Sequence, residues 1–178
     1  MPASLSRTVL RFGLAAGAVL AVTMLLSFGF QDAIGFDHAA VVGYTSMVLA
    51  FLLVYFGVRA HRDGAGGGRI GFWRAFGIGM AIVGVATVCY VATWQFVYHR
   101  LAPDFLDRYA AHALDKARKA GASDAQLAAT AKEMAEFAEL YRNPLVNIGF
   151  TLLEPLPVGL VFSFVSAGLL SRRRAKPD

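Results

Sequence analysis

Apolar residues fill four long stretches of the chain, and the shorter segments between them carry most of the charge. Each stretch spans about 20 residues or more, the length that an α-helix needs to cross roughly 30 Å of hydrocarbon. The pattern therefore predicts membrane-spanning helices at about residues 12–31, 38–58, 75–98 and 145–171. We expect an all-α, polytopic membrane protein with four transmembrane helices in a single membrane domain, residues 1–178.

The fourth stretch differs from the others because it is longer than one crossing needs and contains Glu154, Pro155 and Pro157. Proline has no N–H group, so it is tolerated in the first turn of a helix and disfavoured further along. These prolines predict a break between a short helix, from about Leu145 to Leu153, and a crossing helix that starts at about Pro155. Glu154 would then lie near the N–H groups at the positive start of the crossing helix.

Residues 99–144, between the third and fourth stretches, carry the signals of two helices joined by a turn. Gly121 fits the end of a first helix, and Ser123 with Gln126 forms a capping box for a second. We expect a helical hairpin insert on the outer side of the membrane. Its second helix has an apolar stripe that packs on the first helix, rests on the membrane surface or forms a partner-binding groove. The stripe comprises Leu127, Ala131, Met134, Phe137 or Ala138, and Tyr141.

Composition and charge agree with a membrane protein. Hydrophobic residues make up 57% of the chain, and the mean hydropathy is +0.53. The net charge of +5 requires no nucleic-acid partner, because the basic residues cluster beside the predicted spans. Cytoplasmic loops are enriched in Lys and Arg, so this distribution predicts that both termini lie in the cytoplasm. The flanking basic residues are Arg7, Arg11, Arg59, Arg62, Arg69, Arg74, Arg172, Arg173, Arg174 and Lys176.

Several polar residues fall at a similar depth near the outer surface. With a rise of about 1.5 Å per residue, Glu154 lies about 27 Å above the inner boundary, Tyr44 about 22 Å and His38 about 31 Å. The same count brings Tyr90, Trp94 and Gln95 to about 24 to 30 Å. Asp37 lies at the upper edge of this layer. We therefore treat Asp37, His38, Tyr44 and Glu154 as a candidate polar site.

Two interpretations of this site remain. In the functional one, the residues form a pocket for a proton, a cation or a small ligand, since carboxylates within membrane spans are often functional. In the structural one, which we favour, Glu154 is stabilised near the helix start and the interface without further chemistry. The sequence has no metal-ligand spacing and no nucleophile beside a recognisable base, so we predict no catalytic, cofactor-binding or metal-binding residue.

Three blocks of the sequence, "FDHAAVVGYTSMVLAFLLVYFGVR", "GGGRIGFWRAFGIG" and "LEPLPVGLVFSFVSAGLLSRR", are familiar in combination. With the segment "PDFLDRYAAHALDKARKAGAS" they resemble the domain of unknown function 4199 family, small bacterial membrane proteins with four predicted spans. The resemblance covers nearly the whole chain and implies a multi-pass protein of the bacterial inner membrane. It implies no catalytic residue. It does imply that Asp37, His38, Tyr44, Glu154, Pro155 and Pro157 belong to the family pattern.

These observations predict a non-enzymatic integral membrane protein with a structural, assembly or partner-binding role. Its surroundings are the lipid bilayer and either a second copy of the chain or another membrane protein. The alternative is a small transporter or channel component with a proton- or cation-linked site around Glu154. A membrane enzyme that acts on lipid is a third hypothesis, in which His38 or Glu154 would be needed for turnover.

Overall fold

The computed structural model describes residues 5–171, with the backbone alone at residues 32–34. These residues are almost entirely helical and contain no strand. In chain order the elements are α1 (Leu5–Gly29), α2 (Gln31–Asp63), α3 (Phe72–Phe96), the π-helical turn η1 (Val97–Leu101), α4 (Phe105–Lys119), α5 (Asp124–Arg142), α6 (Pro144–Leu153) and α7 (Leu156–Leu170).

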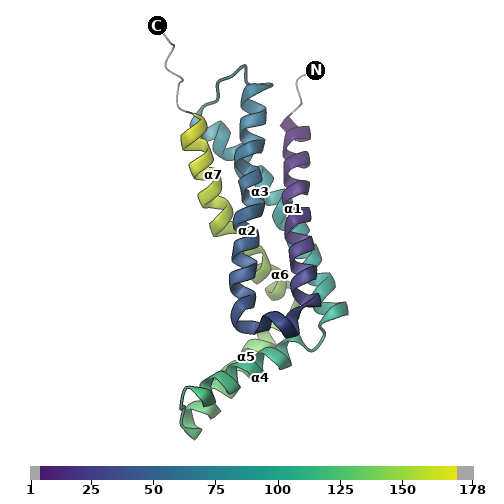
Figure 1. The fold of residues 1–178 in the computed structure, drawn as a ribbon, viewed down its shortest axis with the longest axis vertical. Helices are drawn as coiled ribbons and strands as arrows, with labels where there is room; N and C mark the ends of the chain where they lie inside the picture. Colours follow the sequence, from purple (N-terminus) through teal and green to yellow (C-terminus); the bar gives the residue numbers. More distant parts are fainter. Residues whose placement is uncertain (1–4, 172–178) are drawn as a thin grey trace.

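Four helical segments in the described part of the chain are long and apolar enough to cross a membrane. They are Leu5–Gly29, Gly35–Asp63, Phe72–Leu101 and Pro144–Leu170. The chain is therefore an all-α polytopic membrane protein, as the hydrophobic pattern predicts. Figure 1 shows α1, α2, α3 and α7 side by side in one bundle, with α4 and α5 projecting from one end of it. We call this the α4–α5 end, and the opposite end, where α1 begins and α7 ends, the terminal end.

Helix α3 packs closely against each neighbouring helix of the bundle through glycine. On α1, Cβ atoms added at Gly13 and Gly17 would lie 2.6 Å from the Cβ atoms of Val85 and Cys89. On α2, an added Cβ at Gly57 would lie 2.5 Å from Ile82 Cδ1 of α3. Helices in lipid associate largely through such close packing, because lipid chains are as apolar as the side chains they replace.

The contact between α3 and α7 has an antiparallel register. Gly79 of α3 faces Ser163 of α7, since an added Cβ at Gly79 would lie 2.9 Å from Ser163 Oγ. One turn further along α3, Val83 fits against Gly159, where an added Cβ would overlap Val83 Cγ1. A step of four residues toward the C-terminus of α3 therefore corresponds to a step of four residues toward the N-terminus of α7. We call this contact, continued along α6, the α3 seam.

The break in the fourth span lies where the prolines predict it. Helix α6 ends at Leu153 and α7 begins at Leu156. The interruption is slight, because Glu154 and Pro155 keep right-handed helical angles and the Glu154 N–H still donates to the Phe150 carbonyl at 3.2 Å. No side chain caps the start of α7. Pro155 and Pro157 remove N–H groups from this first turn, so the carboxylate of Glu154 has little there to accept from.

Helices α4 and α5 pack against each other and against the end of the bundle from which they project. The capping box at the start of α5 is present: the Ser123 N–H donates to Gln126 Oε1 at 2.8 Å, and the Ser123 hydroxyl accepts from the Gln126 N–H. A second, smaller core joins the helix pair to the bundle, centred on buried Trp94 and Tyr141. The Trp94 ring lies 5.1 Å from that of Phe105 on α4, a distance at which aromatic pairs are stabilising.

Helix α2 contains a second break, at Gly35, and the residues just beyond it contact α4. Gly35 has φ of +70°, a conformation that glycine adopts readily and other residues rarely do. Beyond it, the Phe36 ring lies 5.2 Å from the His112 ring and 6.0 Å from the Tyr109 ring, both on α4. The turn at Gly35 thus helps to fix the position of α4 relative to the bundle.

The α3 seam yields a stability prediction. Gly159→Ala is expected to destabilise the protein by about 1 to 3 kcal/mol, the usual cost of overpacking a core, because the added methyl group collides with Val83. Gly168→Ala, on the same helix but with open space around it, is the matched control and should be neutral or slightly stabilising. Thermal unfolding in detergent micelles, followed by circular dichroism, measures both. Equal midpoints for the two variants would contradict the close contact.

Candidate functional site

Two side-chain hydrogen bonds continue the α3 seam toward the α4–α5 end. The Tyr90 hydroxyl of α3 donates to Glu154 Oε2 at 2.9 Å, and Gln95 Nε2 donates to Asn147 Oδ1 of α6 at 2.7 Å. Both bonds follow the antiparallel register set by Gly79 and Gly159. The break between α6 and α7 therefore does not interrupt the seam, and four polar side chains meet along it. We call Tyr90, Gln95, Asn147 and Glu154 the polar layer.

The two pairs of the polar layer differ in burial. Asn147 is only 1% exposed, and its Nδ2 atom has no hydrogen-bond partner among the described residues. Beside it, buried Thr151 donates its hydroxyl proton to the Asn147 carbonyl at 2.8 Å. Glu154, in contrast, is exposed on the outside of the bundle. The Gln95–Asn147 pair thus joins the two helices, while the Glu154 carboxylate is accessible from outside.

Tyr141 of α5 closes the polar layer on the side of α4 and α5. Its ring lies 5.7 Å from that of Tyr98 and 5.3 Å from that of Phe137. Burial raises the pKa of the Tyr141 phenol, so this side chain stays neutral at physiological pH. It contributes apolar packing and a hydroxyl group to the layer, not a charge.

The structure places the four residues of the predicted polar site in two groups. Glu154 bonds to Tyr90, and Tyr44 of α2, which is 52% exposed, lies within electrostatic range of Tyr90. Asp37 instead faces α4, where Lys116 Nζ lies 2.8 Å and His112 Nε2 3.4 Å from its Oδ1 atom. His38, next to Asp37, is exposed. No described hydrogen bond or ion pair joins Asp37, Tyr44 and Glu154 to one another.

Asp37 therefore connects α2 to α4. Its bond raises the pKa of the Lys116 ammonium group, which keeps the pair charged. Both side chains are more than half exposed, and pairs of this kind contribute little to stability. The aromatic contacts of neighbouring Phe36 are the stronger part of this connection.

Below the polar layer the bundle interior is apolar and tightly packed. Val83, Ile82 and Phe51 are fully buried, and Val83 lies against Gly159. Beyond them lies the Ser163 hydroxyl, which is buried with no hydrogen-bond partner among the described residues. This apolar packing separates Glu154 from the polar atoms nearer the terminal end.

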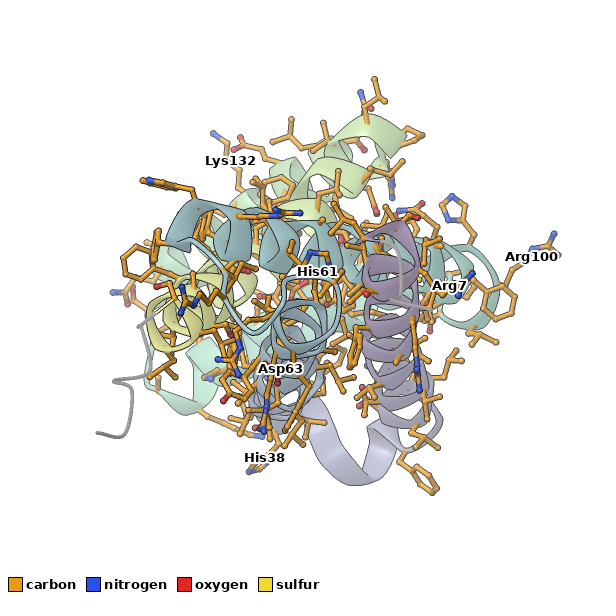
Figure 2. The ribbon with its side chains drawn as sticks, turned by 90° about the horizontal axis from the view of Figure 1, so that it is seen from above. Arg7, His38, His61, Asp63, Arg100 and Lys132 are labelled. Carbon is orange, nitrogen blue, oxygen red and sulfur yellow. The ribbon has the colours of Figure 1, made fainter. Side chains whose placement is uncertain are left out.

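A buried histidine lies at the terminal end of α2. His61 is 3% exposed, and neither of its ring nitrogens has a hydrogen-bond partner among the described residues. Figure 2, which looks along the bundle from the terminal end, shows its side chain near the middle of the helices. The described residues contain no group of three or more His, Cys, Asp or Glu side chains that could hold a metal ion.

The sequence analysis does not single out Asn147 of the polar layer or its neighbour Thr151. A signal for them exists: Asn147, Thr151 and Glu154 recur at i, i+4 and i+7 on an otherwise apolar helical stretch. That spacing aligns polar groups along one side of a helix. In a membrane span, a polar stripe of this kind indicates a helix contact more often than lipid exposure.

Comparison with known proteins matches the chain to one protein family, but to no individual protein. No curated protein and no solved structure matches the chain. A family described as "Protein of unknown function (DUF4199)" matches residues 11–172, which is most of the chain. The chain belongs to this family of membrane proteins of unknown function.

Proposed function

We propose that the chain is a non-enzymatic membrane protein that binds a second copy of itself or another membrane protein through α4 and α5. The observation that carries this proposal is a groove of about 310 Å³ between these two helices. Its apolar lining includes Leu114, Ala131 and Met134, and its charged lining includes Asp107 and Arg142. A lining with both apolar and charged residues suits a helical or extended segment of a protein partner.

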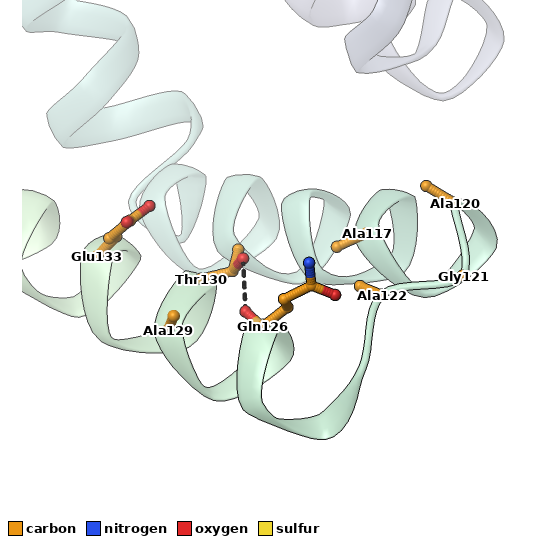
Figure 3. A pocket seen from close by; sticks show the side chains of 8 residues that line it. All are labelled: Ala117, Ala120, Gly121, Ala122, Gln126, Ala129, Thr130 and Glu133. Carbon is orange, nitrogen blue, oxygen red and sulfur yellow. Dashed lines mark hydrogen bonds between the residues drawn. The ribbon is translucent and has the colours of Figure 1, made fainter.

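The end of the helix pair offers a second, shallower surface. An open hollow of about 560 Å³ lies beside the turn between α4 and α5, and half of the residues that line it are alanines. Figure 3 shows Ala117 and Ala120 on one side of it and Ala129 with Thr130 on the other. Small residues allow a partner to approach closely. The hollow and the groove together leave much of the helix pair available for binding.

The attachment of the helix pair to the bundle also supports this role. Trp94, Phe105 and Tyr141 join α4 and α5 to α3, and Phe36 with Asp37 joins α4 to α2. A binding surface held on a rigid support loses less conformational entropy on association than a flexible one. The projecting helix pair therefore has the properties of a preorganised binding element.

The distribution of charge supports an orientation in the bacterial inner membrane. Arg7, Arg11, Arg59 and Arg74 lie on helices near the terminal end of the bundle. The positive-inside rule favours a cytoplasmic position for that end. The helix pair α4–α5 would then lie on the extracytoplasmic side, where it meets partners outside the cytoplasm.

A second candidate is a small transporter or channel component with a proton- or cation-linked site at Glu154. The exposed carboxylate and its bond to Tyr90 favour it, because such groups mark ion pathways in many transporters. The close packing of Val83 against Gly159 weighs against a pathway through a single copy. Transport would require the α3 seam to open or a pathway between copies.

The first prediction of the proposal concerns crosslinking from the groove. A photo-crosslinking amino acid at Ala131, which lines the groove, should yield a discrete crosslinked species in native membranes. The same amino acid at Ala128, exposed on α5 but outside both hollows, is the matched control. Immunoblotting and mass spectrometry identify the species as a dimer or a complex with one partner. Equal crosslinking from both positions, or none from Ala131, would contradict binding in the groove.

The second prediction separates the two candidate functions. Glu154→Gln keeps the shape of the side chain and removes its charge, so a transporter that depends on this carboxylate should lose proton or cation flux in proteoliposomes. Under the binding proposal, wild type and variant show the same background flux, and crosslinking from Ala131 is retained. A flux carried by wild type and lost in the variant would support transport and oppose the binding role.

A further inference from the structure

Among the described residues, the carboxylate of Glu154 has no basic side chain as an ion-pair partner. Its hydrogen bond comes from the neutral hydroxyl of Tyr90. The ion pairs of the described residues include none at Glu154. One neutral donor compensates only part of the cost of holding a carboxylate among apolar groups. A cation from outside the chain would therefore stabilise this carboxylate.

Two counts along the helices give the depth of this carboxylate. Glu154 lies 16 residues before Leu170, the last residue of α7, which at 1.5 Å per residue is about 24 Å from the terminal end of the span. On α3, Tyr90 lies 16 residues beyond Arg74, which is about 24 Å. In a hydrocarbon core of roughly 30 Å, both counts place the pair about 5 Å below the membrane surface at the α4–α5 end.

The surroundings of Glu154 select the kind of cation. The neighbouring surface is apolar, with Leu153 64% exposed and the Phe150 ring exposed one turn earlier on α6. A Ca²⁺ or Mg²⁺ ion needs six or more oxygen ligands or bound waters, and one carboxylate with one phenol does not provide them. An organic ammonium group needs fewer polar partners, and its carbon atoms and charge are stabilised by apolar and aromatic neighbours.

We infer that Glu154 and Tyr90 form a binding site for the primary ammonium group of an aminophospholipid headgroup. A headgroup just above the hydrocarbon boundary is within reach of a carboxylate about 5 Å below it, since both groups extend toward each other. The ammonium group donates to the carboxylate oxygens while the acyl chains cover Phe150 and Leu153. Anionic headgroups are disfavoured by the charge of Glu154, and a choline headgroup has no N–H to donate.

This site is distinct from the groove between α4 and α5. It does not depend on a protein partner or on transport. A static lipid contact requires neither an open seam nor turnover, so its experiments give results separate from those on crosslinking and flux.

The experiment measures the lipid retained by the purified full-length chain. The protein is reconstituted in nanodiscs of phosphatidylcholine with a minor fraction of either phosphatidylethanolamine or phosphatidylglycerol, and native mass spectrometry counts the bound lipids. Wild type should retain phosphatidylethanolamine about fivefold more than either other lipid, the ratio expected from roughly 1 kcal/mol for one charge pair. Glu154→Gln should abolish this preference. Glu136→Gln, an exposed carboxylate on α5, is the matched control and should leave it unchanged.

Two further measurements keep the inference testable if Glu154→Gln fails to fold. In wild type, retention should fall from phosphatidylethanolamine to its N,N-dimethyl form and again to phosphatidylcholine as N–H donors are removed. Free ethanolamine in the buffer should not displace the lipid. Equal retention of the three headgroups, or unchanged preference in a folded Glu154→Gln variant, would overturn the proposed site. Displacement by free ethanolamine would assign it to a water-borne amine instead of a lipid.

Discussion

The close packing of α3 against its three neighbours is the contact on which the rest of the structure depends. Gly13 and Gly17 of α1, Gly57 of α2 and Gly159 of α7 each allow a side chain of α3 to occupy the space of a missing Cβ atom. In lipid there is little hydrophobic gain from bringing helices together, so this close approach supplies much of the stabilisation. Helix α3 is thus the common partner of the bundle, and its register with α7 sets the positions of the polar groups.

The same register explains how a broken span remains a single unit. Pro155 and Pro157 remove N–H groups at the junction of α6 and α7 and so weaken the backbone hydrogen bonding between the two helices. The hydrogen bonds of Tyr90 to Glu154 and of Gln95 to Asn147 hold α6 against α3 in line with α7. Polar groups in a membrane span are unfavourable unless they are paired, which makes these bonds specific as well as stabilising. The exposed carboxylate of Glu154 is a by-product of this arrangement that remains available to a ligand.

The α4–α5 end is organised by aromatic side chains instead of glycine. Trp94, Phe105 and Tyr141 fill the junction between the bundle and the helix pair. This junction lies near a membrane surface, where aromatic residues are favoured because they combine apolar rings with polar atoms. Attachment through these aromatic contacts gives the helix pair a defined direction relative to the bundle.

The sequence by itself determined the four membrane spans, the break at Pro155 and the capping box of Ser123 with Gln126, because each follows from local chemistry. Span length is set by the thickness of the bilayer, and proline and capping effects act within a few residues. Counting residues along each span from the inner boundary also placed Tyr90 at the depth of Glu154. Only the tertiary structure decided the partners of the polar residues: Asp37 turned toward α4 because Gly35 redirects the chain, and Asn147 met Gln95 through the α3 seam. Such pairings depend on helix rotation and register, which packing between distant segments decides.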